Sequence, residues 1–213
     1  EAERKQLALL HFFQGFVDVD ALRIMGDPEM EWCLPEVRGL TREAGIALLD
    51  RAAEVGLLTA HGGGYYTIHP ALPWYFKSLF DQYYPQSPVS NIQSPTRAFV
   101  EAVGGWGSYY TNQYVAGNRE VVGVLTAEEA NLLHARRLAR ANGWWRRVIN
   151  TMQGLDVLYD LTGRRAEWAR LVQEIVPGFV DPASDGPLPG REEDWSLVTE
   201  YRVRLAQEAR QWA

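Results

Sequence analysis

Three consecutive glycines, at positions 62–64, separate two short runs of strand-forming residues, and this arrangement constrains the fold more than any other stretch. Residues 57–60 precede the glycines, and residues 65–68 (Tyr-Tyr-Thr-Ile) follow them. Two such runs around a glycine-rich turn predict a β-hairpin. The second run leads through His69 into residues 71–84, an aromatic-rich segment that predicts an amphipathic helix.

Helical patterns fill most of the chain before the hairpin. Apolar spacing predicts three helices there, over residues 5–14, 19–25 and about 41–55. Either Asp18 or Asp20 can cap the second helix, and Thr41 is a good N-cap for the third. Three helices followed by a hairpin is the order of a winged helix-turn-helix. We therefore predict a mainly α fold whose first domain is a winged helix over residues 1–86, with the hairpin as its wing.

A Pro- and Ser-containing stretch at 85–91 marks the predicted domain boundary, and the remainder is again helical. Helices are predicted from Ser94-Pro95, from Thr126 with the capping-box pattern Thr126-x-x-Glu129, over about 144–161, over about 164–176, and from about Trp195 onward. Helices joined by short glycine turns predict an α-helical-hairpin solenoid over residues 94–213. The last helix has no partner after it, so we expect the solenoid to be truncated at its C-terminus.

Glycines 104, 105 and 107 lie inside the first solenoid helix, where each costs about 1 kcal/mol relative to alanine. Close approach of a neighbouring helix would explain why they are kept. We therefore expect a second helix to pack closely against this segment.

Charge and composition restrict the function classes. No apolar run approaches the ~18 residues of a membrane-spanning helix, the N-terminus does not resemble a secretory signal, and Cys33 is the single cysteine. We expect a cytoplasmic protein without membrane contact. Residues 1–86 carry 7 Lys and Arg against 12 Asp and Glu, a net charge of −5. That excess of negative charge counts against a nucleic-acid partner.

The sequence contains no recognisable catalytic or metal-binding pattern. The phosphate-binding pattern G-x-x-x-x-G-K-[ST] is absent, and no nucleophile is paired with a base. His11, His61, His69 and His134 are not spaced as metal ligands with one another or with Cys33. We therefore expect no enzyme activity, metal or cofactor in the chain itself.

Charged residues gather in two further patterns. The carboxylate pairs 128–129 and 192–193 are expected near helix starts, where they suit the helix dipole. Eight arginines in the predicted solenoid form either a surface for an anionic partner or a solvated face. They are Arg136, Arg137, Arg140, Arg146, Arg147, Arg164, Arg165 and Arg170.

Residues 144–176 resemble a tetratricopeptide repeat in part. With Gly163 at the turn of the repeat, Leu155 and Tyr159 fall on its leucine and tyrosine positions. The expected glycine is Asp156, however, and the expected alanine of the second helix is Trp168. The match favours a helical-hairpin solenoid over a standard repeat.

The first part of the chain resembles the winged helix of STAND signalling ATPases, the class that includes the apoptosome protein and plant resistance proteins. The segments LALLHFFQGFVDVDAL and ALLDRAAEVGLL, the glycine turn and YTIHPAL carry the resemblance. In that class a winged helix follows the P-loop domain, and helical repeats often follow the winged helix. The resemblance implies a regulatory and protein-interaction fragment that docks in cis on an upstream nucleotide-binding domain, while the repeats receive a protein or ligand signal.

His69 is the one candidate binding residue. The family's Met-His-Asp motif falls on Ile68-His69-Pro70, and the resemblance implies that His69 contacts the phosphate of ADP in the parent protein. ADP or ATP would be a cofactor of that parent only. The residue type alone is equally consistent with a strand-end residue that caps the next helix or bonds to backbone.

Two other functions are compatible with the same pattern. The first is a winged-helix transcription regulator that binds DNA, although its recognition helix would carry Arg42 and Arg51 against three acids, Glu43, Asp50 and Glu54. The second is a structural scaffold in which both regions form one rigid unit.

Overall fold

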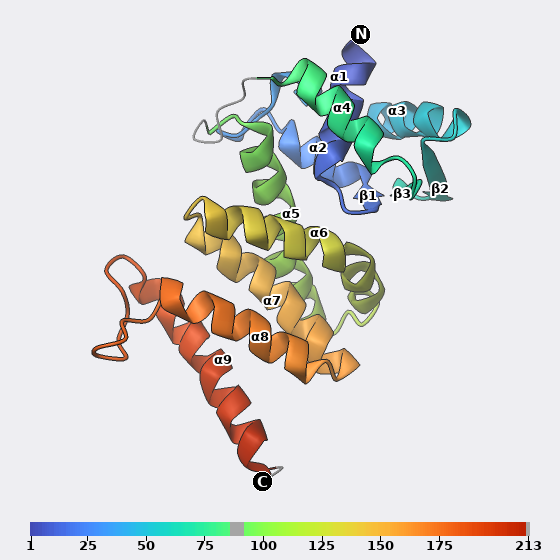
Figure 1. Ribbon diagram of the computed structural model, residues 1–213. Coiled ribbons are helices and arrows are strands. Elements are labelled where there is room, and N and C mark those ends of the chain that lie inside the picture. Colours follow the sequence, from blue (N-terminus) through green and yellow to red (C-terminus); the bar gives the residue numbers. More distant parts are fainter. Residues whose placement is uncertain (86–91, 212–213) are drawn as a thin grey trace. The chain divides into compact units, whose positions relative to one another are not determined.

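Helices account for most of the chain, together with one small antiparallel sheet (Figure 1). The structure is a computed structural model that describes residues 1–85 and 92–211. The mainly helical class predicted from the sequence is confirmed. The chain divides into two compact units, Glu1–Gly154 and Leu155–Ala213, and each is described by itself.

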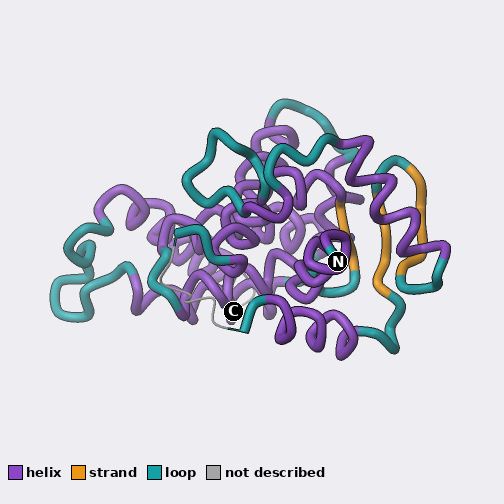
Figure 2. Tube along the Cα trace, turned by 90° about the horizontal axis from the view of Figure 1, so that it is seen from above, coloured by secondary structure: helices purple, strands orange, loops and turns teal. Residues whose placement is uncertain are grey.

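The sheet has three strands in the order β1-β3-β2, all antiparallel (Figure 2). β2 (Leu58–Gly62) and β3 (Tyr65–Ile68) form the predicted hairpin, and a bulge lies between Ala60 and Gly62. The glycines of the turn have φ of +79°, +62° and +86°, values that side-chain-bearing residues rarely adopt. β1 (Phe16–Asp18) was not predicted, because three residues are too few to show an alternating pattern.

Five helical segments lie before the predicted boundary, in addition to the sheet. They are α1 (Ala2–Ala8), the 3₁₀ helix η1 (Leu9–Phe12), α2 (Val19–Met25), α3 (Arg42–Glu54) and α4 (Pro73–Tyr83), and a 3₁₀ turn η2 (Pro35–Val37) joins α2 to α3. The helix predicted over 5–14 therefore begins and ends earlier in the chain, and it changes to 3₁₀ geometry at Leu9. Of the two candidates for the cap of α2, Asp18 provides it by accepting from the Asp20 amide. The predicted Thr41 cap forms, since its hydroxyl accepts from the Ala44 amide. α4 packs on α1 and η1, which buries Leu9 and Phe76 completely.

α5 (Pro95–Val115) and α6 (Val121–Ala141) belong to the same compact unit and pack against each other. α5 also packs on α2, and α6 packs on β1. The predicted start of the second helix at Thr126 is wrong. The helix begins five residues earlier because Val121 and Leu125 are buried apolar residues at helical spacing. The Thr126 hydroxyl donates to the Val122 carbonyl within the helix and caps nothing.

The predicted close approach to the α5 glycines is found at Gly107. A Cβ atom there would lie 2.0 Å from the carbonyl oxygen of Asn150 in α7 (Trp145–Thr162). A Cβ at Gly104 would lie 3.2 Å from the side chain of Arg147, whereas one at Gly105 would meet nothing within 4 Å. Close packing therefore accounts for Gly107 and not for Gly105.

The second unit contains the end of α7, α8 (Arg165–Ile175), the 3₁₀ turn η3 (Val176–Gly178) and α9 (Glu192–Gln211). α8 packs on α9, where the Trp168 and Tyr201 rings meet edge to face at 4.9 Å. Between η3 and α9, residues Val180 and Pro187 form an isolated β-bridge. α9 begins three residues before Trp195, and its first turn is acidic, as predicted for the 192–193 pair.

The domain boundary assigned from the sequence, between 1–86 and 94–213, stays a prediction. Residues 86–91 of the predicted linker lie outside the described residues.

Candidate functional site

His69 lies directly after β3, at the turn that leads into α4. Its side chain is exposed, and Nδ1 accepts a hydrogen bond from the Ala71 amide at 3.3 Å. Its backbone amide donates to Leu57, and its carbonyl accepts from the Leu72 amide. The residue thus has the strand-end role that the sequence offered as one of two possibilities. Contact with a nucleotide stays a prediction.

An apolar groove of about 640 Å³ lies beside this turn. It is bounded by residues 10–15, the end of β3, the start of α4 and Ala130 of α6. Trp74 contributes one wall and is 68% exposed, which is unusual for the largest apolar side chain. The turn therefore combines an accessible imidazole with an exposed aromatic surface.

The other three histidines make contacts with side chains of the protein itself. The ring of His11 lies 5.1 Å from Phe80, the ring of His134 lies 5.8 Å from Phe99, and His61 pairs with the Thr67 hydroxyl at 3.1 Å. Burial lowers the pKa of His11, and lowers the pKa of His134 to about 4. Within residues 1–85 and 92–211 no group of three or more His, Cys, Asp or Glu could hold a metal ion.

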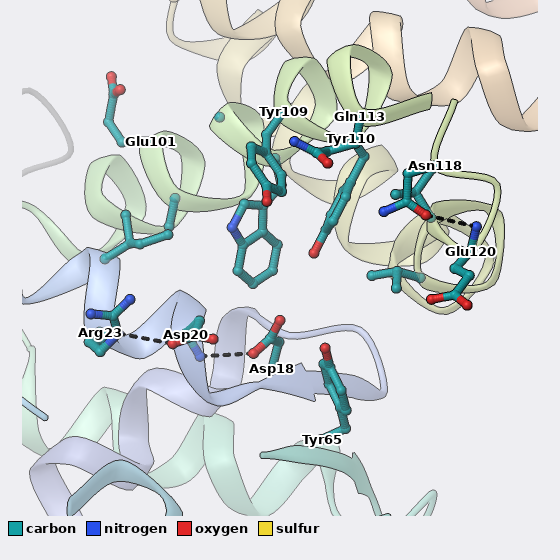
Figure 3. Close-up of a pocket in the computed structure, with 16 residues that line it drawn as sticks. Asp18, Asp20, Arg23, Tyr65, Glu101, Tyr109, Tyr110, Gln113, Asn118 and Glu120 are labelled. Atoms are coloured by element: carbon teal, nitrogen blue, oxygen red, sulfur yellow. Dashed lines mark hydrogen bonds and ion pairs between the residues drawn. The ribbon is translucent and has the colours of Figure 1, made fainter. Parts of the chain in front are cut away.

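A second cavity, of about 630 Å³, lies within the first unit between α2 and β3 on one side and α5 and α6 on the other (Figure 3). Acidic and aromatic side chains dominate its wall. The polar and aromatic lining residues are Asp18, Asp20, Arg23, Tyr65, Glu101, Trp106, Tyr109, Tyr110, Gln113, Asn118 and Glu120. Its volume is in the range of small-molecule sites.

Asp18 is a buried carboxylate at the wall of the cavity, with an exposed fraction of 4%. It is the last residue of β1 and lies opposite Tyr65 of β3. One carboxylate oxygen, Oδ1, accepts from the Asp20 amide at 2.8 Å, and no hydrogen bond to a described residue engages Oδ2. Burial raises the pKa of Asp18 to about 6, against the opposing effects of the Asp20 amide and of nearby arginines. The carboxylate is therefore mostly ionised at neutral pH.

Two other acids of the cavity are already neutralised by arginines. Asp20 pairs with Arg23 at 2.9 Å and with Arg42 at 3.4 Å. Glu101, whose side chain is 1% exposed, pairs with Arg97 and Arg147, and Figure 3 shows its carboxylate directed away from the other labelled residues.

Four aromatic residues line the cavity, and three of them pack together along α5. The ring centroids of Trp106 and Tyr110 are 6.2 Å apart, and those of Tyr109 and Tyr110 are 5.3 Å apart. Burial and neighbouring carboxylates raise the pKa of Tyr110 and of Tyr65 above the ordinary value. Both phenols therefore stay protonated at neutral pH.

Glu128 of α6 lies close to this cavity and is completely buried. Its Oε2 accepts from Asn131 Nδ2 at 2.7 Å, and its Oε1 has no hydrogen-bond partner among the described residues. The same Asn131 donates to the Phe16 carbonyl and accepts from the Gln14 amide, which ties α6 to β1. Burial raises the pKa of Glu128 to about 8, and the charge of Asp18 adds to this shift.

Sequence reasoning missed most of this cavity. It considered Asp18 only as a helix cap, and it placed Glu128 near a helix start, which is wrong because the residue lies in the middle of α6. One of the eight arginines of the predicted surface, Arg136, is not on the surface, since it is 2% exposed. One usable signal was present: the turn-forming residues Gly117-Asn118 come shortly before residues 121–125, four of which are apolar.

No protein family, curated protein or solved structure was found to match this chain. None of the helices in the described part of the chain has the length and apolar character needed to cross a membrane.

Proposed function

We propose that the chain is a non-catalytic regulatory and protein-interaction region of a STAND-type signalling ATPase. In this proposal residues 1–86 form a winged helix that docks in cis on a nucleotide-binding domain encoded upstream, and the later helices receive a protein or ligand signal. The observation that carries the proposal is the exposed turn at the end of β3, where His69 and Trp74 face solvent.

The order of elements supports a winged helix. Helices α1, α2 and α3 precede the β2–β3 hairpin, and β1 pairs with β3 to complete a small antiparallel sheet. α4 then covers α1. The β3–α4 turn follows the central strand and is exposed, so a neighbouring domain can reach it.

The chemistry of the turn supports docking on a nucleotide-bound domain. Nδ1 of His69 is used by the Ala71 amide, so the imidazole is oriented, and Nε2 makes no hydrogen bond to a described residue. An oriented N–H can donate to a phosphate oxygen. The groove beside Trp74 supplies apolar surface of the kind that domain interfaces bury.

The surface of α3 disfavours the alternative of DNA binding. Arg51 pairs with Glu3 at 2.7 Å, and Arg42 bonds to Asp20 and to the Gly63 carbonyl. Both arginines of the helix are therefore engaged within the protein. The remaining charges on α3 are acidic and repel phosphate.

The test uses the protein expressed from its whole reading frame, with whatever precedes Glu1. Retention of ADP after gel filtration is measured for the natural protein, for His69→Ala and for His61→Ala. His61 is the matched control, since it is also an exposed histidine of the hairpin region. We expect His69→Ala to release ADP faster and to raise basal ATP turnover, while His61→Ala behaves like the natural protein.

Two results would overturn the proposal. One is the absence of a nucleotide-binding domain from the complete protein. The other is equal ADP retention by both variants, because removal of an imidazole that contacts the phosphate must weaken ADP binding.

A further inference from the structure

Three polar groups in the cavity of Figure 3 lack hydrogen-bond partners among the described residues. They are Oδ2 of Asp18 and the hydroxyls of Tyr65 and Tyr110, and the figure shows all three directed toward the same part of the cavity. The electrostatic influence of Asp18 and Tyr65 on the pKa of Tyr110 is consistent with their closeness. Asp18 is buried, whereas Tyr65 and Tyr110 are partly exposed to the cavity. Polar groups that converge in one cavity lined by aromatic side chains are typical of a ligand site.

The charged residues of the cavity indicate the sign of the charge that a ligand would carry. Among the described residues that line it, Arg23 is the one cation, and it is paired with Asp20. Glu101 is neutralised by two arginines, whereas Asp18 and Glu120 have no ion pair among the described residues. Two carboxylates without an ion pair among the described residues, one of them 4% exposed, favour a cation.

The aromatic lining favours an organic cation over a metal ion. Trp106, Tyr109 and Tyr110 supply ring faces and edges on the α5 side. Such rings attract ammonium groups and cover apolar bodies, and a hard metal ion would instead require several oxygen ligands. A volume of about 630 Å³ has room for a small organic molecule.

We propose that this cavity binds a small organic cation with a primary ammonium group and an apolar body, and that Asp18, Tyr65 and Tyr110 accept the three N–H donors. The apolar body lies against Trp106 and Tyr109. Glu120 at the cavity rim attracts the cation as it enters. This inference goes beyond the proposed function and does not depend on a nucleotide-binding domain.

Calorimetric titration of the purified chain tests the site with three probes of similar size. They are 2-phenylethylammonium, benzyltrimethylammonium, which has no N–H donor, and the neutral 2-phenylethanol. At about pH 7.5, above the pKa of Asp18, we expect saturable one-to-one binding of the primary ammonium. We expect the other two to bind roughly tenfold more weakly or worse, because each loses a charged hydrogen bond.

Variants then locate the site. Asp18→Asn keeps the side-chain oxygen that caps α2 and removes the charge, and Tyr110→Phe removes a single hydroxyl. We expect Asp18→Asn to weaken binding of 2-phenylethylammonium about tenfold and Tyr110→Phe to weaken it severalfold. Glu54→Gln makes the same charge change on an exposed position of α3 and should leave binding unchanged.

Three results would overturn the proposal: no saturable binding of 2-phenylethylammonium up to about 10 mM, equal binding of 2-phenylethanol, or unchanged binding by folded Asp18→Asn protein. Far-ultraviolet circular dichroism and urea unfolding establish that each variant is folded. The ADP-retention experiment on the whole protein does not test cation binding in this cavity. Likewise, an absence of cation binding would not test the role of His69.

Discussion

Asp18 and Tyr65 lie directly opposite each other in the antiparallel pair β1–β3, so their side chains stand on one face of the sheet. The neighbouring pair, Val17 and Tyr66, faces the other way and is buried in the core. A slip of one residue in this register would exchange the two pairs. The core packing of Val17 and Tyr66 therefore also fixes the carboxylate and the phenol at the wall of the cavity.

The cap that Asp18 provides to α2 can be measured by comparing two variants. Asp18→Asn retains an oxygen that can accept from the Asp20 amide, and Asp18→Ala does not. Both remove the carboxylate, so their difference isolates the cap. We expect the alanine variant to be less stable than the asparagine variant by about 1 kcal/mol in urea unfolding. Equal stabilities would show that the cap contributes nothing.

Glu128 should make the stability of the protein fall as the pH rises. Its pKa is raised from 4.5 to about 8, so between these values the folded chain holds a proton that the unfolded chain has released. By linkage, folding becomes less favourable with increasing pH through this window. Glu128→Gln removes the effect. We expect the free energy of unfolding of the variant, relative to that of the natural protein, to rise by on the order of 3 kcal/mol between pH 5 and pH 8.

Urea unfolding at several pH values measures this gain. The groups that face Glu128 are Asn131 on its own helix, Asp18 at the end of β1 and Tyr110 on α5. The raised pKa of Asp18 acts with the same sign but over a lower window, from 3.8 to about 6. A Glu128→Gln difference that does not grow above pH 6 would contradict the assignment.

Local sequence signals predicted the helices and the hairpin well, because those signals act over a few residues. Thr41, Ser94 and the glycines at 62–64 each specify a cap or a turn without reference to the rest of the chain. The start of α6 was misplaced because a capping-box pattern at Thr126 is also an ordinary helix-interior sequence. Burial of Val121, a tertiary effect, decides the boundary.

The cavity could not be predicted from the sequence, since it depends on packing between distant segments. Its wall joins β1 and β3, which pair across about fifty residues, to α5 and α6. β1 has three residues and no pattern of its own, so the position of Asp18 opposite Tyr65 was not accessible. His69 was singled out from a local motif that resembles one of a known family, and its nucleotide contact stays a prediction. The hydrogen bond that it accepts from the Ala71 amide is an ordinary structural contact.

Gly107 and Gly105 should respond oppositely to substitution by alanine. A Cβ at Gly107 would lie 2.0 Å from the Asn150 carbonyl oxygen, so α5 and α7 must separate there. We expect Gly107→Ala to lower the free energy of unfolding by about 2 kcal/mol or more. Gly105 has open space, and alanine there should add about 0.5–1 kcal/mol through helix propensity. Urea unfolding of both variants compares them, and a neutral Gly107→Ala would show that the helices pack less closely.

Glu101 should be among the most costly acids to remove from the first unit. Its side chain is 1% exposed and lies between the guanidinium groups of Arg97 and Arg147. Glu101→Gln leaves two partly buried cations without their counter-charge, and we expect it to lower the free energy of unfolding by about 3 kcal/mol. Asp81 is the matched control, since it pairs with Lys77 where both side chains are 59% exposed. Asp81→Asn should change stability by less than about 1 kcal/mol. Similar losses in the two variants would contradict the view that burial makes the Glu101 pair costly to break.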